Sequence, residues 1–192
     1  MKYTIPAVIF AGGKSSRMGE DKALLPFQNY ATFSEFQYQK LQQWFEEVYL
    51  SAKTKKFPFS SKVIKDTCKE SSPLVGLISV FEQLESDAIF ILSVDAPLVN
   101  EAIVKKLWDA YKKETNIHAI IAQSPSGLQP LCGIYKKSIL PYAKTNLGNN
   151  KHSLKALLNE YPTKSVLFKD DTPFTNVNTQ DEYLRLLRGK LS

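Results

Sequence analysis

Few residues in this sequence belong to the types that most readily reveal an enzyme. Its 192 residues include two histidines and two cysteines. The cysteines, Cys68 and Cys132, lack metal-site spacing, and we expect two free thiols because a cytosolic setting disfavours their pairing. The sequence also lacks an HExxH metal motif, a CxxC motif and a GxSxG nucleophile elbow. These absences argue against zinc, dithiol and serine-nucleophile chemistry.

Long hydrophobic runs are missing as well. No apolar stretch approaches the length that crosses a membrane. The N-terminus lacks the charged segment, apolar core and cleavage site of a signal peptide, and we find neither internal repeats nor low-complexity tracts. At 43% hydrophobic residues the chain can bury a sizeable core. We expect one domain spanning residues 1–192, a monomer that resides in the cytoplasm.

The net charge of +6 suits an anionic partner. Lysines are spread along the whole chain, without a long basic run or an RNA-recognition motif. A nucleic-acid binder would rest on net charge alone. The pattern therefore favours small phosphorylated ligands over a polymer.

Apolar runs alternate with amphipathic segments along the chain. The expected strands are Ile5–Phe10, Glu47–Ser51, Lys62–Lys65, Ala88–Val94, His118–Ala122, Leu131–Tyr135 and Ser165–Phe168. The expected helices are Phe33–Phe45, Leu74–Leu84, Glu101–Lys113, Lys137–Lys144, Ser153–Tyr161 and Thr179–Arg188. This alternation predicts an α/β fold with a mostly parallel sheet and helices on both faces. The nearly continuous apolar run at 88–94 predicts a central strand buried on both sides.

A glycine-rich, cationic loop follows the first expected strand. It has the sequence AGGKSSRMGEDK from Ala11 to Lys22. Glycines let backbone N–H groups approach an anion, while Arg17 and Lys22 add positive charge, so the loop predicts a phosphate site. It is neither a P-loop, whose first glycine position holds Val8, nor a GxGxxG fingerprint. The alternative is a flexible basic turn.

Asp95 ends the buried strand, where a carboxylate is costly unless it is paired or holds a cation. Beside a phosphate loop it is a candidate magnesium ligand, because Mg²⁺ takes one or two carboxylates together with phosphate oxygens and waters. The alternative is an N-cap for the following helix. Asn100 can supply that cap itself, so we favour metal ligation.

Other polar residues follow other strands. Asn176 and Asn178 are two residues apart and could complete a metal or phosphate site, while Asn178-Thr179, with Glu182 nearby, could equally cap the last helix. We expect one asparagine to join the site and the other to cap the helix. Asp66 either binds a ribose or base edge or begins a turn. His152 lies in a basic stretch that either holds an anionic acceptor or begins a helix.

Together these segments resemble the molybdenum cofactor guanylyltransferase (MobA) family of nucleotidyltransferases. The resemblance rests on Phe10–Gly19 with Asp21 and Lys22, on Asp66 with Pro73–Gly76, on Asp95–Pro97, on Gln129–Gly133 and on Asn176–Thr179. It implies a Rossmann-like, GT-A-like three-layer fold that uses GTP, Mg²⁺ and the molybdopterin cofactor, whose product is the guanine dinucleotide. Molybdenum cofactor biosynthesis enzymes and molybdoenzyme chaperones would be the protein partners.

The resemblance and the residue patterns described above together predict roles for individual residues. The nucleotide would be bound by Phe10, Ala11, Gly12, Gly13, Lys22, Ser51, Asp66 and Asp95. Arg17, Lys22 and Asp95 would take part in catalysis, and Asp95 with Asn178 would hold the metal. Three positions depart from the family pattern: Phe10 replaces a leucine, Ser72 a glycine, and Ser51 an asparagine found in some members.

The implied reaction needs no covalent enzyme intermediate. The acceptor phosphate attacks the α-phosphate of GTP in line and expels pyrophosphate, so that positioning and charge neutralisation suffice. We expect the acceptor pocket in a variable loop such as Thr145–His152. A related CTP-dependent cytidylyltransferase and a non-catalytic nucleotide-binding protein are the alternatives.

Overall fold

The computed structural model describes residues 2–12, 21–66 and 72–188. Its strands are β1 (Ala7–Phe10), β2 (Val48–Ala52), β3 (Val63–Lys65), β4 (Ala88–Ser93), β5 (Ala119–Ser124), β6 (Gly127–Lys136) and β7 (Thr163–Leu167). Its α-helices are α1 (Phe33–Trp44), α2 (Pro73–Gln83), α3 (Glu101–Tyr111), α4 (Leu140–Gly148), α5 (Leu154–Glu160) and α6 (Gln180–Leu187). Three 3₁₀ turns, η1 (Lys22–Leu24), η2 (Lys137–Ile139) and η3 (Thr172–Phe174), complete the described elements.

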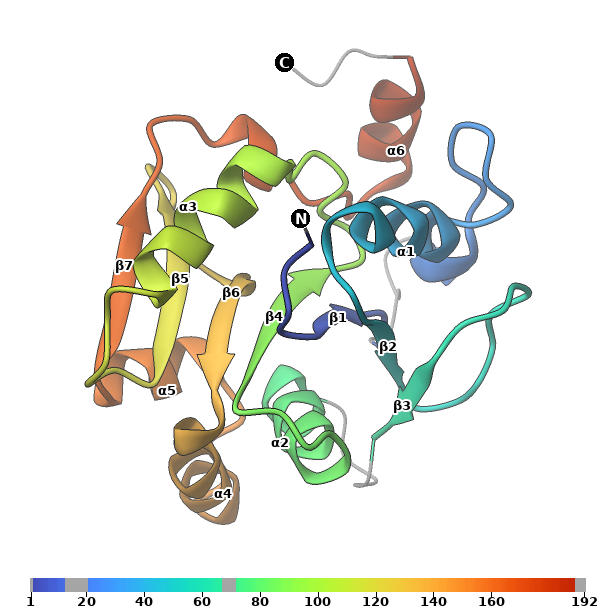
Figure 1. The fold of residues 1–192 in the computed structure, drawn as a ribbon. Helices are drawn as coiled ribbons and strands as arrows, with labels where there is room; N and C mark the ends of the chain where they lie inside the picture. The colour runs from blue at the N-terminus through green and yellow to red at the C-terminus, as the bar shows by residue number, and fades with distance from the viewer. Residues whose placement is uncertain (1, 13–20, 67–71, 189–192) are drawn as a thin grey trace.

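The strands form one sheet in the order β3-β2-β1-β4-β6-β5-β7 (Figure 1). β6 runs antiparallel to both of its neighbours, and the other pairings are parallel. The chain builds outward from β1 through β2 to β3 and then returns to place β4 on the other side of β1. The strand order therefore reverses between β1 and β4, and such a switch point is where open α/β sheets bind ligands.

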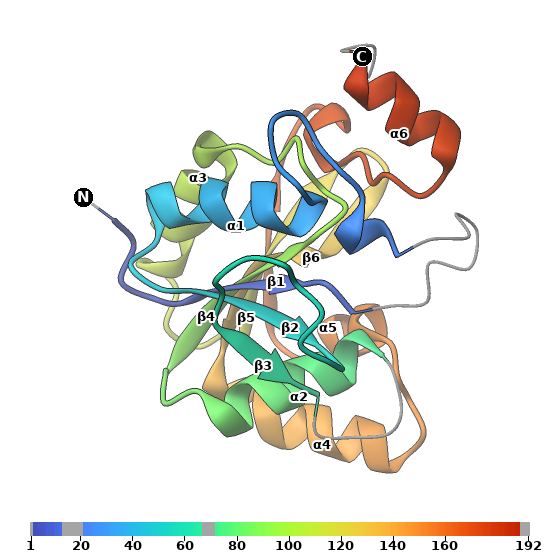
Figure 2. The same ribbon diagram turned by 90° about the vertical axis from the view of Figure 1, so that its right-hand side faces the viewer.

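Helices cover both faces of the sheet (Figures 1 and 2). α1, α3 and α6 pack on one face, in the core that contains Leu41, Phe90 and Leu107. α2, α4 and α5 pack on the other, around Leu77, Ile91 and Leu157. Every residue of β4 is buried because the strand lies between these two cores. The predicted three-layer α/β fold and the doubly buried central strand are confirmed.

The predicted loop at Thr145–His152 is wrong in its first half, because α4 continues to Gly148. Thr145 Oγ1 donates to the Pro141 carbonyl oxygen at 3.0 Å, and the buried Asn146 donates to Glu160 Oε2 at 3.1 Å. The helix ends where Asn150 adopts a left-handed φ of 59°. Polar residue types suggested a loop there, but their side chains bond within the helix and to α5.

The structure describes no helix that is both long and apolar enough to span a membrane.

Candidate active site

An open cleft lies at the carboxyl ends of β1 and β4. It consists of two adjoining hollows of about 550 and 570 Å³. Both are lined by Phe10 and Gly12 at the end of β1, by Ser93 at the end of β4, and by Leu131 of β6. The shared lining makes the two hollows one groove across the switch point.

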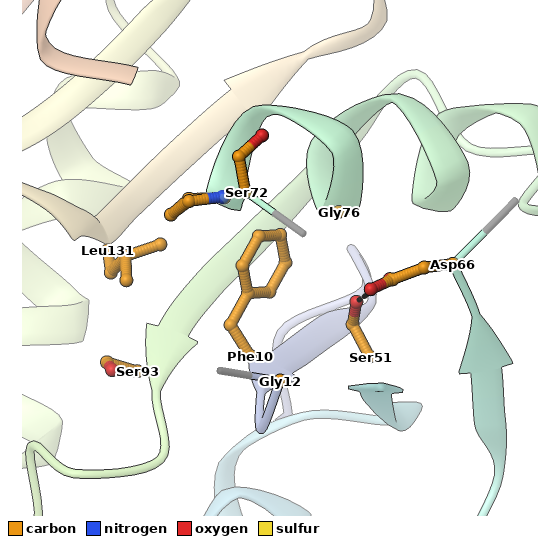
Figure 3. Close-up of a pocket in the computed structure, with 9 residues that line it drawn as sticks. Phe10, Gly12, Ser51, Asp66, Ser72, Gly76, Ser93 and Leu131 are labelled. Atoms are coloured by element: carbon orange, nitrogen blue, oxygen red, sulfur yellow. Dashed lines mark hydrogen bonds between the residues drawn. The ribbon is translucent and has the colours of Figure 1, made fainter. Parts of the chain in front are cut away.

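The first hollow has an aromatic floor. The Phe10 ring lies between Leu131 and α2, where it faces Gly76 (Figure 3). A Cβ atom at Gly76 would come within 2.9 Å of the ring. Glycine at this position therefore lets the Phe10 ring pack closely against α2.

Two polar side chains form one wall of this hollow. Ser51, at the end of β2, donates from Oγ to Asp66 Oδ1 at 3.4 Å, a long hydrogen bond (Figure 3). Burial raises the pKa of the half-buried Asp66, and the bond from Ser51 acts in the opposite direction. This wall presents a hydroxyl and a carboxylate, groups that can bind hydroxyl or amino groups of a nucleoside.

The second hollow ends at the ammonium group of Lys22. Lys22 Nζ donates to Asp95 Oδ2 at 2.8 Å, to Asn178 Oδ1 at 3.0 Å and to the Val177 carbonyl oxygen at 3.1 Å. Lys22 begins η1, and Asp21 caps that turn by accepting from the Ala23 amide. Asp95 and Asn178, each more than 70 positions from Lys22 in the sequence, thus both contact its ammonium group.

Asp95 is held by two further hydrogen bonds, one to its carboxylate and one to its backbone. Ser93 Oγ donates to Asp95 Oδ1 at 2.5 Å, and the Val177 amide donates to the Asp95 carbonyl oxygen at 2.9 Å. The cap of α3 is Asn100, whose Oδ1 accepts from the Ile103 amide at 3.2 Å. The alternative role for Asp95 as a helix cap is therefore excluded.

The two asparagines near the C-terminus differ in position. Asn178 faces Lys22, whereas Asn176 lines a third hollow with Gln129, which shares Ser93 and Leu131 with the cleft. The expectation that an asparagine caps the last helix is wrong, whereas the cap predicted at Asn178-Thr179 with Glu182 is confirmed at Thr179, the N-cap of α6, which forms a reciprocal capping box with Glu182. The threonine hydroxyl satisfies the helix amide, which leaves the Asn178 side chain to Lys22.

The sequence is similar to known nucleotidyltransferases over most of its length. Residues 7–166 match the family described as MobA-like NTP transferase domain. Molybdenum cofactor guanylyltransferase from Campylobacter jejuni is 38% identical over 178 residues, which are 92% of each chain. This chain belongs to the molybdenum cofactor guanylyltransferase family. It is therefore a nucleotidyltransferase of molybdenum cofactor biosynthesis.

Other comparisons agree. Molybdenum cofactor guanylyltransferase from Helicobacter pylori is 32% identical over 187 residues, covering 93% of this chain and 90% of that protein. The crystal structure of molybdopterin-guanine dinucleotide biosynthesis protein A from Archaeoglobus fulgidus has a TM-score of 0.81 at 16% identity. The alignment covers 96% of this chain and 97% of that one. At that identity the likeness shows the fold.

Two predicted site residues of this guanylyltransferase family member, Gly13 and Arg17, lie outside the described residues, as does Cys68. The other predicted residues, Phe10, Ala11, Gly12, Lys22, Ser51, Asp66, Asp95 and Asn178, line the cleft or bond directly to a residue that does. The Ala11 amide donates to the Ser51 carbonyl oxygen at 3.0 Å, so any ligand contact of Ala11 falls to its carbonyl oxygen.

Lys56 was missed in the sequence. Its ammonium donates to the Ala11 carbonyl oxygen at 3.2 Å and pairs with Asp21. It thus joins the loop after β2 to both ends of the glycine-rich loop. The sequence signal for Lys56 was its position in the lysine-containing loop that follows β2. Because β2 lies next to β1, this loop and the glycine-rich loop lie at the same edge of the sheet.

The donor set at Asp95 fits a hard divalent cation. A carboxylate oxygen of Asp95 and the amide oxygen of Asn178 both accept hydrogen bonds from the Lys22 ammonium group. Among residues 2–12, 21–66 and 72–188, no three His, Cys, Asp or Glu side chains cluster as metal ligands. Mg²⁺ takes one or two protein oxygen ligands and completes its coordination with waters and substrate phosphates; Asp95 and Asn178 offer oxygens of that kind.

Nucleophile chemistry finds no support at Cys132 or His118. Cys132 is a buried free thiol, whose pKa burial raises to about 12. His118 Nδ1 lies 2.8 Å from Ser138 Oγ, and the imidazole packs against Tyr142.

Proposed function

We propose that this protein transfers GMP from GTP to the molybdopterin cofactor, giving the guanine dinucleotide and pyrophosphate. The meeting of Lys22, Asp95 and Asn178 at one end of the cleft carries the proposal, together with membership of the family. It joins a phosphate-binding cation to two oxygen ligands for a divalent ion.

The nucleoside part of GTP would occupy the hollow around Phe10. We assign its contacts to backbone groups of Phe10 through Gly13 and to the Ser51–Asp66 wall. The cleft runs from this hollow to Lys22 without interruption, because the two hollows share their lining. A nucleotide lying along it would bring its phosphates to Lys22.

At the phosphate end, Lys22 and Arg17 would bind the triphosphate, and Asp95 and Asn178 would hold Mg²⁺. When bound there, Mg²⁺ supplies neutralisation of the negative charge on the phosphate oxygens. The Lys22 ammonium donates to both the Asp95 and the Asn178 oxygens. Nucleotide binding would therefore draw its ammonium toward the phosphates and free Asp95 and Asn178 for the cation.

The acceptor's terminal phosphate is largely ionised at neutral pH. One of its oxygens would form a bond to the α-phosphorus of GTP while the bond to the β-phosphate oxygen breaks. The electron pair leaves with pyrophosphate, which Lys22 and Arg17 would stabilise. No general base is needed, in agreement with a described cleft lined by neither histidine nor cysteine.

The test is to incubate the protein with Mg²⁺, molybdopterin and each nucleoside triphosphate in turn, and to measure pyrophosphate. We expect release with GTP, and the guanine dinucleotide as product. A clear preference for CTP would replace the proposal by a cytidylyltransferase, and nucleotide binding without release would indicate a non-catalytic protein. The monomeric state, cytoplasmic location and protein partners stay predictions.

A further inference from the structure

A buried glutamine on helix α1 donates hydrogen bonds to the loop that carries Asp95. Gln37 Nε2 lies 3.3 Å from the carbonyl oxygens of Ser93 and Val94, and 3.0 Å from that of Ala96. The Gln37 side chain is fully buried. One amide group therefore holds the backbone immediately before and after Asp95.

A lysine about one turn further along α1 donates hydrogen bonds to the same loop. Lys40 Nζ donates to the carbonyl oxygens of Pro97 at 2.8 Å and Val99 at 3.0 Å. Its ammonium also lies 5.2 Å from the centre of the Phe36 ring. Gln37 and Lys40 lie three positions apart, so both side chains project from the same face of α1.

Both side chains are energetically unfavourable on a helix whose role is only to pack against the sheet. Gln37 Oε1 is buried and has no hydrogen-bond partner in the part of the chain that is described. Burial also lowers the pKa of Lys40 to about 7, because it disfavours the charged form of the side chain. Apolar side chains would avoid both penalties. Unlike apolar side chains, Gln37 and Lys40 provide N–H donors for the carbonyl oxygens of the loop.

We propose that Gln37 and Lys40 are positioning residues, which hold the loop from Ser93 to Val99 so that the Asp95 carboxylate is set for a divalent cation. The inference rests on the proposed function. Asp95 itself is tied from the other side by Ser93 Oγ and the Val177 amide. The hydrogen bonds from α1 supply the remaining restraints on the backbone around Asp95. A metal-binding side chain must be held within about 0.5 Å of its productive position.

The main test is Gln37→Met, which keeps the side chain's length and removes its donors. Loss of an outer-shell partner typically costs about 10- to 100-fold in metal affinity or activity. We expect the Mg²⁺ concentration for half-maximal turnover to rise about tenfold or more, with kcat lowered and the KM for GTP changed by less than about twofold. The matched control is Gln39→Met on the exposed face of α1, which should leave these constants unchanged.

A second readout does not depend on turnover. The affinity for GTP is measured with Mg²⁺ and with EDTA in each variant. We expect Gln37→Met to keep the wild-type affinity in EDTA and to lose the gain that Mg²⁺ provides. Lys40 is partly exposed, and Lys40→Met should also lose the gain in GTP affinity that Mg²⁺ provides. Lys40→Arg, which keeps N–H donors, should retain most of that gain.

The outcomes separate the positioning role from a structural one. If Gln37→Met and Lys40→Met lower the melting temperature but keep the wild-type Mg²⁺ dependence in both assays, the positioning role is refuted. A wild-type GTP affinity that ignores Mg²⁺ also refutes it. If wild-type protein releases no pyrophosphate with molybdopterin, the proposed function fails, while the Mg²⁺-dependent affinity still decides the role of Gln37 and Lys40.

Discussion

The substitution Asp95→Asn separates catalysis from stability most sharply. It keeps the size of the side chain and removes one negative charge. In the structure this carboxylate pairs with Lys22 at 2.8 Å, and the two side chains are 16% and 19% exposed. The pair therefore lies between an exposed ion pair, worth about 0–1 kcal/mol, and a buried one, whose disruption costs about 3–5 kcal/mol.

We expect the free energy of unfolding to fall by about 1–2 kcal/mol, because the asparagine oxygen can still accept from Lys22. Turnover should fall far more. A group that stabilises charge in the transition state is worth about a hundredfold or more in rate, which corresponds to about 2.7 kcal/mol of activation free energy. The two effects thus differ in both size and origin.

The assay is pyrophosphate release from GTP with Mg²⁺ and molybdopterin, well below the melting temperature of the variant, with urea denaturation alongside. Asp109→Asn is the control, because Asp109 forms an exposed pair with Lys105 on α3, remote from the cleft. It should keep wild-type turnover. Near-normal turnover in Asp95→Asn would refute the assignment of Asp95 to the metal.

Three further predictions concern the scaffold. Gly133→Ala should lower the free energy of unfolding by about 1–3 kcal/mol in urea titrations, because its Cβ would lie 2.6 Å from a backbone oxygen of β5; Gly148→Ala, with open space around it, should be neutral or slightly stabilising. Gly76→Ala should raise the KM for GTP by displacing the Phe10 ring into the cleft, and an unchanged KM would contradict the assignment of that hollow to the nucleoside. Burial lowers the pKa of Lys40 from 10.5 to about 7, so the folded state binds fewer protons than the unfolded chain between these values and stability rises with pH across that window; Lys40→Met should flatten the rise, measured as urea midpoints at pH 7 and pH 9.

The elements of the fold could be predicted well because their signals are local. The apolar run at 88–94 forms the buried strand β4, and the predicted helix near Glu101 begins after its asparagine cap. The antiparallel direction of β6 was not predicted. Its direction follows from a short turn between β5 and β6 that leaves no room for a crossover helix.

For the site, sequence patterns singled out Lys22 and Asp95, because a cationic loop and a carboxylate after an apolar strand are unusual in themselves. They did not single out Gln37, Lys40 or Lys56. These three donate mainly to backbone carbonyl oxygens, which every residue carries, so no partner appears in the sequence to mark them.

The alternation of strands and helices and the family could both be read from the sequence alone, because each depends on residue types at short spacing. Only the tertiary structure decided that Asn178 meets Lys22, 156 positions away, and that α1 holds the Asp95 loop. Those contacts depend on where the reversal of strand order places the chain in space, and long-range packing sets that position.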